Sequence, residues 1–211
     1  GVSEKTVNKV LKAYPTIKSV PVFECMLAHD GANHEKKITG KKLLEIKIDG
    51  VRVLTVINVQ NKTVTQYTRN GKVLENFSHI TSAIQANIHV FERSVVLDGE
   101  MLSSSFQDLM KQVHRKSDVK SDDARLMLFD IIPLSEFQAG RSTLGQRRRS
   151  NMLRSMKPIF DKIGSIDIIT QIAVDLDTFV GQLQYKEFNA EAIEHGFEGI
   201  LVKDIDAEYE C

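Results

Sequence analysis

The sequence contains very little cysteine. Its only two cysteines, Cys25 and Cys211, lie far apart and form no Cys-x-x-Cys pair. A disulfide framework or a zinc site needs several closely spaced cysteines, so the sequence argues against both. Free cysteines are typical of a reducing compartment, and we therefore expect a cytoplasmic protein.

The sequence also lacks net charge and long apolar runs. Lys+Arg and Asp+Glu both number 28, so no overall field attracts a polyanion, and a nucleic-acid site must come from local clustering. No apolar run approaches the roughly 18 residues of a membrane helix, and no signal-peptide pattern opens the chain, so we expect no membrane partner. A Gly-x-x-x-x-Gly-Lys-Ser/Thr loop is missing too, which excludes the nucleotide site of P-loop enzymes.

The two ends of the sequence predict that it is part of a longer protein. It begins at Gly1 rather than at a methionine, and it stops at Cys211 directly after an acidic, strand-like segment. A chain of 211 residues can bury one good core, or one large domain with a small appendage. We expect a linker helix from an upstream region over residues 1–20 and one domain over residues 21–211.

The pattern of apolar residues predicts an α+β fold, with antiparallel β-sheets flanked by helices. Short runs rich in β-branched residues predict strands, and the dipeptide Asn70-Gly71 is a strong signal for a tight turn. Apolar residues at three- and four-residue spacing predict helices. The expected strands are 43–49, 51–59, 63–69, 95–102, 126–132, 166–170 and 197–204, and the expected helices are 3–13, 79–89, 106–113, 142–156 and 178–195.

Two of these helices have a predicted buried face. In helix 178–195 the side chains expected to point inward are Phe179, Leu183, Ala190 and Ile193. Helix 142–156 buries Leu144, Met152, Leu153 and Met156. Its other side is basic, with Arg147, Arg148, Arg149 and Arg154, followed by Lys157. A solvated face is the default interpretation of such a run, and contact with phosphate is the alternative.

One stretch, residues 45–52, carries the most distinctive polar pattern. In a strand its apolar residues point to one face, while Glu45, Lys47 and Asp49 point to the other. A lysine between two acids suits a buried ion pair or a covalent nucleophile, and a ladder of surface charges is the commoner outcome. Four further polar signatures follow the lysine motif Lys47-x-Asp49-Gly50-x-Arg52, namely Arg69-Asn70-Gly71, Asp98-Gly99-Glu100, Phe129-Asp130, and Glu198-Gly199-Ile200 with Lys203.

Taken in this order, the five signatures resemble the nucleotidyltransferase motifs of ATP-dependent DNA ligases, RNA ligases and mRNA capping enzymes. Glu198-Gly199 is similar to the final motif of DNA ligases in particular, and Tyr14-Pro15 resembles ligases of T4-like bacteriophages. The resemblance implies a nucleotidyltransferase (ATP-grasp-like) adenylation domain over residues 21–211. It also implies that the chain stops before the last family motif and before an OB-fold domain.

The resemblance implies a role for each matching residue. Lys47 would attack ATP to form a lysyl-adenylate, and Asp49 would serve the later DNA-joining steps. Glu100 and Glu198 would hold Mg²⁺, or Mn²⁺ in its place. The remaining nucleotide contacts would be Glu45 at the adenine edge, Phe129 stacked on the base, and Arg52, Arg69 and Lys203 near phosphate. The implied partner is nicked double-stranded DNA, bound by a monomer.

Several alternatives remain open at this point. The chain could be an RNA ligase, a GTP-using capping enzyme, or a nick-binding module without catalysis. Phe129 could be an ordinary core residue, Asp98 is expected to form a turn, and Asp130 is either a structural acceptor or a group behind the metal ligands. A free lysine has a pKa of about 10.4, so Lys47 also needs nearby cations to become a nucleophile at neutral pH.

Overall fold

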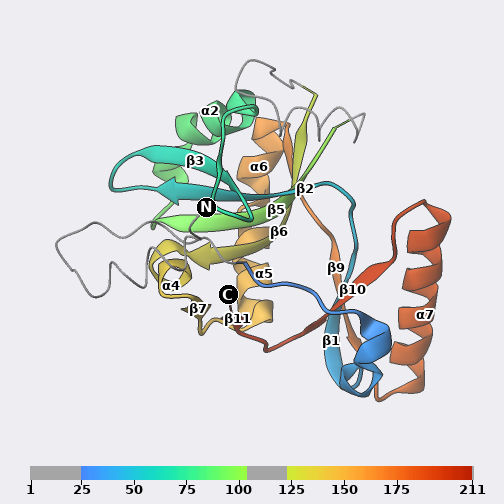
Figure 1. The fold of residues 1–211 in the computed structure, drawn as a ribbon. Coiled ribbons are helices and arrows are strands. Elements are labelled where there is room, and N and C mark those ends of the chain that lie inside the picture. The colour runs from blue at the N-terminus through green and yellow to red at the C-terminus, as the bar shows by residue number, and fades with distance from the viewer. Residues whose placement is uncertain (1–24, 104–122, 211) are drawn as a thin grey trace, which may run out of the picture.

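The computed structural model describes residues 25–103 and 123–210. The helices expected at 3–13 and 106–113, and the linker at 1–20, lie outside the described residues. Within these ranges the expected α+β fold is confirmed, with largely antiparallel sheets and helices packed against them. Figure 1 shows a larger sheet that carries most of the helices, and beside it a smaller sheet backed by α7 (Phe179–Glu194).

The larger sheet has six strands in the order β4-β3-β2-β5-β6-β8, all antiparallel except the β6–β8 pair. Asn70-Gly71 forms the expected turn, with Gly71 at a φ of 77°. The strands predicted over this part of the chain are confirmed. They are β2 (Val51–Asn58), β3 (Thr63–Thr68), β5 (Val95–Leu102), β6 (Arg125–Pro133) and β8 (Ile166–Ile168), with the short β4 (Val73–Leu74) in addition.

Side chains alternate between the two faces of this sheet and build a separate apolar core on each. On one face Val53 and Ile57 pack with residues from α2 (Ser78–Ala86), α5 (Gln146–Ser155) and α6 (Lys157–Ile163). The opposite core contains Leu54, Val96 and Ile132 of the sheet itself. It also contains residues from α4 (Leu134–Gln138), and Tyr209 from a two-stranded sheet of β7 (Arg141–Ser142) and β11 (Tyr209–Glu210). Three short 3₁₀ helices complete the described elements, at Gly31–Asn33, Glu35–Lys37 and Ile88–Val90.

The smaller sheet has the order β10-β1-β9, with β1 (Lys41–Ile46) in the centre and antiparallel to both neighbours. Strand β9 (Gln171–Asp175) was not predicted. The expected strand 166–170 contains β8 alone, and β9 begins directly after it in the other sheet. Strand β10 (Ile200–Asp204) begins three residues later than expected. The chain therefore crosses between the sheets at 47–50 and again at 169–170.

The predicted buried face of α7 is wrong. Phe179 is 81% exposed, Ile193 58% and Leu183 46%, and Ala190 is exposed as well. The helix instead packs on the smaller sheet through the stripe of Tyr185, Phe188 and Ala192. Both stripes recur at helical spacing, so periodicity alone could not choose between them. Gly181 helps to decide the choice, because a Cβ at this residue would lie 1.9 Å from the carbonyl oxygen of Asp175.

Candidate active site at the junction of the sheets

Lys47 lies at the first crossover, directly after β1. Its backbone N–H donates to the carbonyl of Gly199 at 2.9 Å, and its side chain forms an ion pair with Glu198. Both side chains are close to half exposed, at 46% and 44%. The ammonium group is therefore held in place by one carboxylate and is still open to a ligand, unlike the ammonium of a buried structural ion pair.

Gly199 allows Glu198 and Lys203 to serve the same site. In a straight strand these two residues would face opposite sides, because their numbers differ by five. Gly199 has a φ of 138°, which side chains rarely allow, and β10 becomes regular only after it. Glu198 consequently reaches Lys47, while Lys203 reaches Glu45, which lies two residues before Lys47 in the chain.

Glu45 is the buried acid of the site. It is completely inaccessible to solvent, and its carboxylate pairs with Lys203 at 2.7 Å and accepts a hydrogen bond from Gln171 at 2.6 Å. Burial raises the pKa of Glu45, and the charge of Lys203 and the two hydrogen bonds oppose that rise. Glu45 therefore ties β1, β9 and β10 together behind Lys47.

Phe129 is half-buried in β6 and belongs to none of the three apolar cores in the described residues. Its ring contacts two cations instead. The guanidinium carbon of Arg52 lies 5.2 Å from the ring centre, and Nζ of Lys203 lies 5.0 Å from it. These are distances at which a cation is attracted by an aromatic face. The ring thus lies among the charged groups of the site.

Arg52 is oriented by a buried acid whose role the sequence pattern did not predict. Asp98 was expected to form a turn, but it lies inside β5, is fully buried, and accepts two hydrogen bonds from Arg52 at 2.9 and 2.7 Å. Such two-point pairing is the strongest geometry between these groups. The Asp98-Gly99 dipeptide marks a break in the β5–β6 register rather than a chain reversal. A Cβ at Gly99 would lie 2.6 Å from the carbonyl of Met127.

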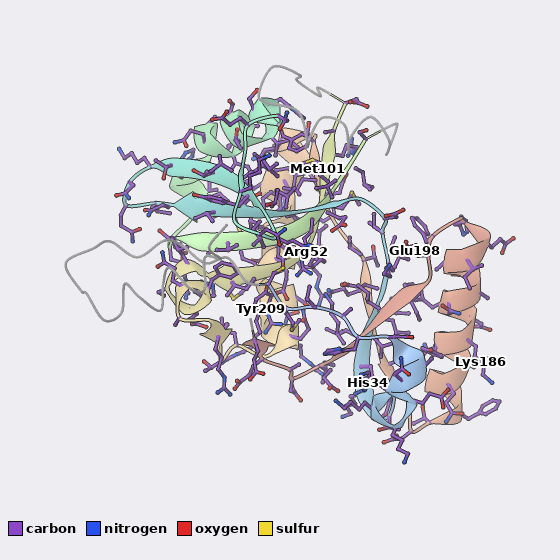
Figure 2. The ribbon with its side chains drawn as sticks, in the orientation of Figure 1. His34, Arg52, Met101, Lys186, Glu198 and Tyr209 are labelled. Atoms are coloured by element: carbon purple, nitrogen blue, oxygen red, sulfur yellow. The ribbon has the colours of Figure 1, made fainter. Side chains whose placement is uncertain are left out.

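Tyr209 completes this network from the other end of the chain. Its hydroxyl donates to Asp98 at 2.8 Å in a buried contact, and both burial and the charge of Asp98 raise the pKa of the phenol. Figure 2 shows Arg52 and Tyr209 on the side of the larger sheet, with Glu198 on the side of the smaller one. β11 therefore helps to fix the acid that orients Arg52, although no sequence motif pointed to Tyr209.

We expect Tyr209→Phe to weaken the fold. The change removes one hydroxyl and leaves the fully buried carboxylate of Asp98 with one donor fewer, which costs about 1–3 kcal/mol. Urea unfolding of the variant beside the parent measures the difference. As a control, Tyr185→Phe alters a partly buried ring that packs in the smaller sheet, and it should cost less. Equal values for the two variants would contradict the role of the Tyr209 hydroxyl.

Glu100 lies opposite Arg52 in the β2–β5 register, beside the crossover that carries Asp49. The crossover passes close to β5 at Gly50, and only glycine fits there, because a Cβ would lie 2.5 Å from the carbonyl oxygen of Met101. Burial raises the pKa of Glu100 to about 7, against the opposing charge of Arg52, while the acids Asp98 and Asp49 add to the rise. The site therefore holds a carboxyl group that ionises at an energetic cost unless a cation joins it.

A pH dependence of stability follows for the metal-free protein. The pKa of Glu100 is about 7 when folded and near 4.5 when unfolded, so the folded state binds more protons between these values. Stability contributed by this group is full below about pH 4.5 and is lost as pH rises to 7. Glu100→Gln should remove that loss and be more stable than the parent by roughly 3 kcal/mol at pH 8. Urea unfolding in EDTA at pH 5 and pH 8 measures it. If the stability difference between Glu100→Gln and the parent were the same at pH 8 as at pH 5, the raised pKa of Glu100 would be contradicted.

Two predicted site residues, Arg69 and Asp49, are exposed to solvent. Arg69 lies just after β3. Burial raises the pKa of the Cys25 thiol, and the charges of Arg52 and Arg69 oppose that rise. Asp49 is exposed in the crossover. Among the described residues, no group of three or more His, Cys, Asp or Glu side chains could by itself hold a metal ion.

The basic face predicted for helix 142–156 is partly wrong. The helix begins at Gln146, and Arg149 is fully buried, whereas Arg147, Arg148, Arg154 and Lys157 are exposed. Arg149 donates to Asp130 at 2.8 Å and to the carbonyl of Ala207 at 3.1 Å. Asp130 also accepts from its neighbour's backbone N–H, so it is a structural acceptor.

Comparison with known proteins identifies the family. The ATP dependent DNA ligase domain matches residues 25–211, which is most of the chain. The chain belongs to this family. Curated ligases are similar over most of its length: the DNA ligase of Methanopyrus kandleri is 27% identical over 201 residues, and one from Methanothermobacter thermautotrophicus is 27% identical over 195. Each match covers 87% of this chain but only 34% and 33% of the respective ligase, so the chain spans about a third of these relatives.

Solved structures of ligases have the same fold. A structure titled Pmar-Lig_Pre. is 47% identical, with a TM-score of 0.88, over 100% of this chain and 49% of its own. The ATP-dependent DNA ligase from bacteriophage T7 in complex with ATP is 19% identical, with a TM-score of 0.61, over 92% of this chain and 66% of its own. The ligase-family nucleotidyltransferase fold is thereby confirmed. The narrower resemblance to T4-like bacteriophage ligases stays a prediction. In the part of the chain that the structure describes, no helix is long and apolar enough to cross a membrane.

Proposed function

We propose that this chain is the adenylation domain of an ATP-dependent DNA ligase that seals nicks in duplex DNA. The observation that carries the proposal is Lys47, a half-exposed lysine held by Glu198 where the two sheets meet. Around it lie a buried acid, an aromatic ring and two further cations, Arg52 and Lys203.

Lys47 would supply the nucleophile of the first step. Its Nζ forms a bond to the α-phosphorus of ATP, the bond from that phosphorus to the bridging oxygen breaks, and pyrophosphate leaves. The attacking amine gives up a proton, and the carboxylate of Glu198, which pairs with it, is placed to accept that proton. Arg52 and Lys203 attract the phosphates that the reaction brings in. The adenylyl group would then pass to the 5′-phosphate at a nick, and the 3′-hydroxyl would displace AMP.

Glu100 and Glu198 fit the role of carboxylate ligands for a divalent cation. Mg²⁺ is usually held through one or two carboxylates together with substrate phosphates, so the lack of a three-residue cage among the described side chains agrees with this role. A cation would also compensate the cost of ionising Glu100, whose pKa burial raises to about 7. Mg²⁺, or Mn²⁺ in its place, would neutralise phosphate charge.

The other predicted site residues would bind the nucleotide or the DNA. Phe129 would stack on adenine, Glu45 would lie close to the adenine edge, and Lys203 would lie near the α-phosphate. Arg52 and Arg69 would contact nucleotide or DNA phosphate, and Asp49 would act in joining the DNA ends. We propose nicked duplex DNA as the partner of a monomer, residues 21–211 as the adenylation domain, residues 1–20 as a linker, and an OB-fold domain beyond Cys211.

The reaction can be tested by intact mass after incubation with ATP or GTP and Mg²⁺, followed by addition of a nicked duplex of DNA or RNA. We expect one adenylyl group from ATP only, transferred to nicked DNA. A guanylyl adduct would favour a capping enzyme, and transfer to RNA alone would favour an RNA ligase. A protein extended beyond Cys211 should be tested in parallel. If neither protein gains mass but both bind nicked DNA, a nick-binding module without catalysis becomes the better explanation.

A further inference from the structure

Gln171 lies where the chain enters the smaller sheet, as the first residue of β9. Its side-chain nitrogen, Nε2, donates to the carboxylate of Glu45 at 2.6 Å and to the backbone carbonyl of Phe129 at 3.3 Å. These two residues belong to β1 and β6, one from each sheet. Gln171 thus joins the buried acid of the site to the strand that carries its aromatic ring.

These two contacts fix which way the amide of Gln171 points. A side-chain amide has one end that donates and one that accepts. Glu45 and the Phe129 carbonyl can only accept, so a reversed amide would place its oxygen against two other acceptors and lose both hydrogen bonds. The nitrogen end is therefore held by Glu45 and the Phe129 carbonyl, and the oxygen, Oε1, takes part in neither of these contacts. Gln171 is only half-buried, whereas Glu45 is inaccessible.

We propose that Gln171 is the residue that selects adenine in this site. Its Oε1 accepts a hydrogen bond from the exocyclic amine at carbon 6 of the purine, while the base stacks beside Phe129. Guanine carries an oxygen at that position, and two acceptors would then face each other. This inference rests on the proposed function, because it places the base of ATP next to the Phe129 ring.

The experiment compares ATP with purine riboside triphosphate, which lacks only the amine at carbon 6. The measured quantity is the rate of adduct formation on the protein at low nucleotide concentration, as a ratio of the two rates. We expect the parent to prefer ATP by about tenfold or more, the effect of leaving one polar partner unpaired. Gln171→Leu has a similar size and no acceptor, so its preference should fall below about twofold.

A matched control is Gln182→Leu. Gln182 also donates through Nε2 to a backbone carbonyl, that of Leu176 at 3.2 Å, but it lies on α7. This variant should keep the preference of the parent. If Gln171→Leu does not fold, Gln171→Met replaces it.

The outcomes separate the two levels of the proposal. Two results would overturn the selecting role of Gln171 and leave the ligase function standing. In the first, the parent forms adducts from ATP and from the analogue at equal rates. In the second, Gln171→Leu slows adduct formation from both nucleotides equally and keeps the tenfold preference for ATP. The second pattern would mean that Gln171 only positions Glu45. If the parent forms no adduct with either nucleotide, the proposed function itself fails, and this inference fails with it.

Discussion

Replacing Lys47 with arginine should abolish formation of the adenylyl adduct. Arginine keeps the positive charge and can still pair with Glu198, so the change tests chemistry rather than folding. A guanidinium stays protonated at any ordinary pH and is not a nucleophile towards phosphorus. We expect the rate of adduct formation with ATP to fall by roughly a thousandfold or more, measured by intact mass against time.

The control for this prediction is Lys186→Arg. Lys186 is an exposed lysine on α7, the helix behind the smaller sheet. Figure 2 shows it apart from Glu198. Its substitution should leave the rate unchanged. The urea midpoint of Lys47→Arg should match that of the parent, since the replaced side chain is nearly half exposed. A variant that still accepts an adenylyl group at the parental rate would contradict the role of Lys47.

Replacing Arg149 with leucine should destabilise the fold severely. Arg149 and Asp130 are both buried, and the arginine also donates to Gln146 and to the carbonyls of Leu144 and Ala207. Removing the cation leaves the Asp130 charge buried without compensation, a change that costs about 3–5 kcal/mol. For a chain of this size that corresponds to a fall in Tm of roughly 10 °C.

Two further variants make this prediction specific. Arg154→Leu changes an exposed arginine on the same helix and should cost no more than about 0.5 kcal/mol. The double variant Arg149→Leu with Asp130→Leu removes both charges and should recover part of the loss, because a buried ion pair can often be replaced by apolar side chains. Thermal unfolding followed by circular dichroism measures all three. If Arg149→Leu were as stable as Arg154→Leu, the buried pair of Arg149 and Asp130 would contribute little to the stability of the fold.

Much of the site could be predicted from short polar signatures inside apolar strands. The placement of Glu198 beside Lys47, and of Glu100 opposite Arg52, depends on backbone features that the sequence displays, such as Gly199 and Gly50. Each of these glycines is required by local geometry, a close approach at Gly50 and a positive φ at Gly199. The order of the motifs then indicated the family, because no single dipeptide could have done so.

The errors arose where a local pattern has two structural meanings. Asp98-Gly99 is a turn dipeptide by composition, yet in β5 it supplies a buried partner for Arg52 and a shift in strand register. Three consecutive arginines look alike in sequence, and only the packing of α5 against β6 distinguishes Arg149 from Arg147. Tyr209 and Gln171 carried no signal at all, since their importance comes from contacts with residues more than 100 positions away.

The measurement that tests the central claim most directly is peptide mapping of the protein after incubation with ATP and Mg²⁺. We expect one adenylyl group per molecule, attached to the peptide that contains Lys47 and removed when nicked DNA is added. An adenylyl group on another lysine of the site, such as Lys203, would contradict the assignment of the nucleophile, and so would an adduct at Lys47 that forms equally well from GTP.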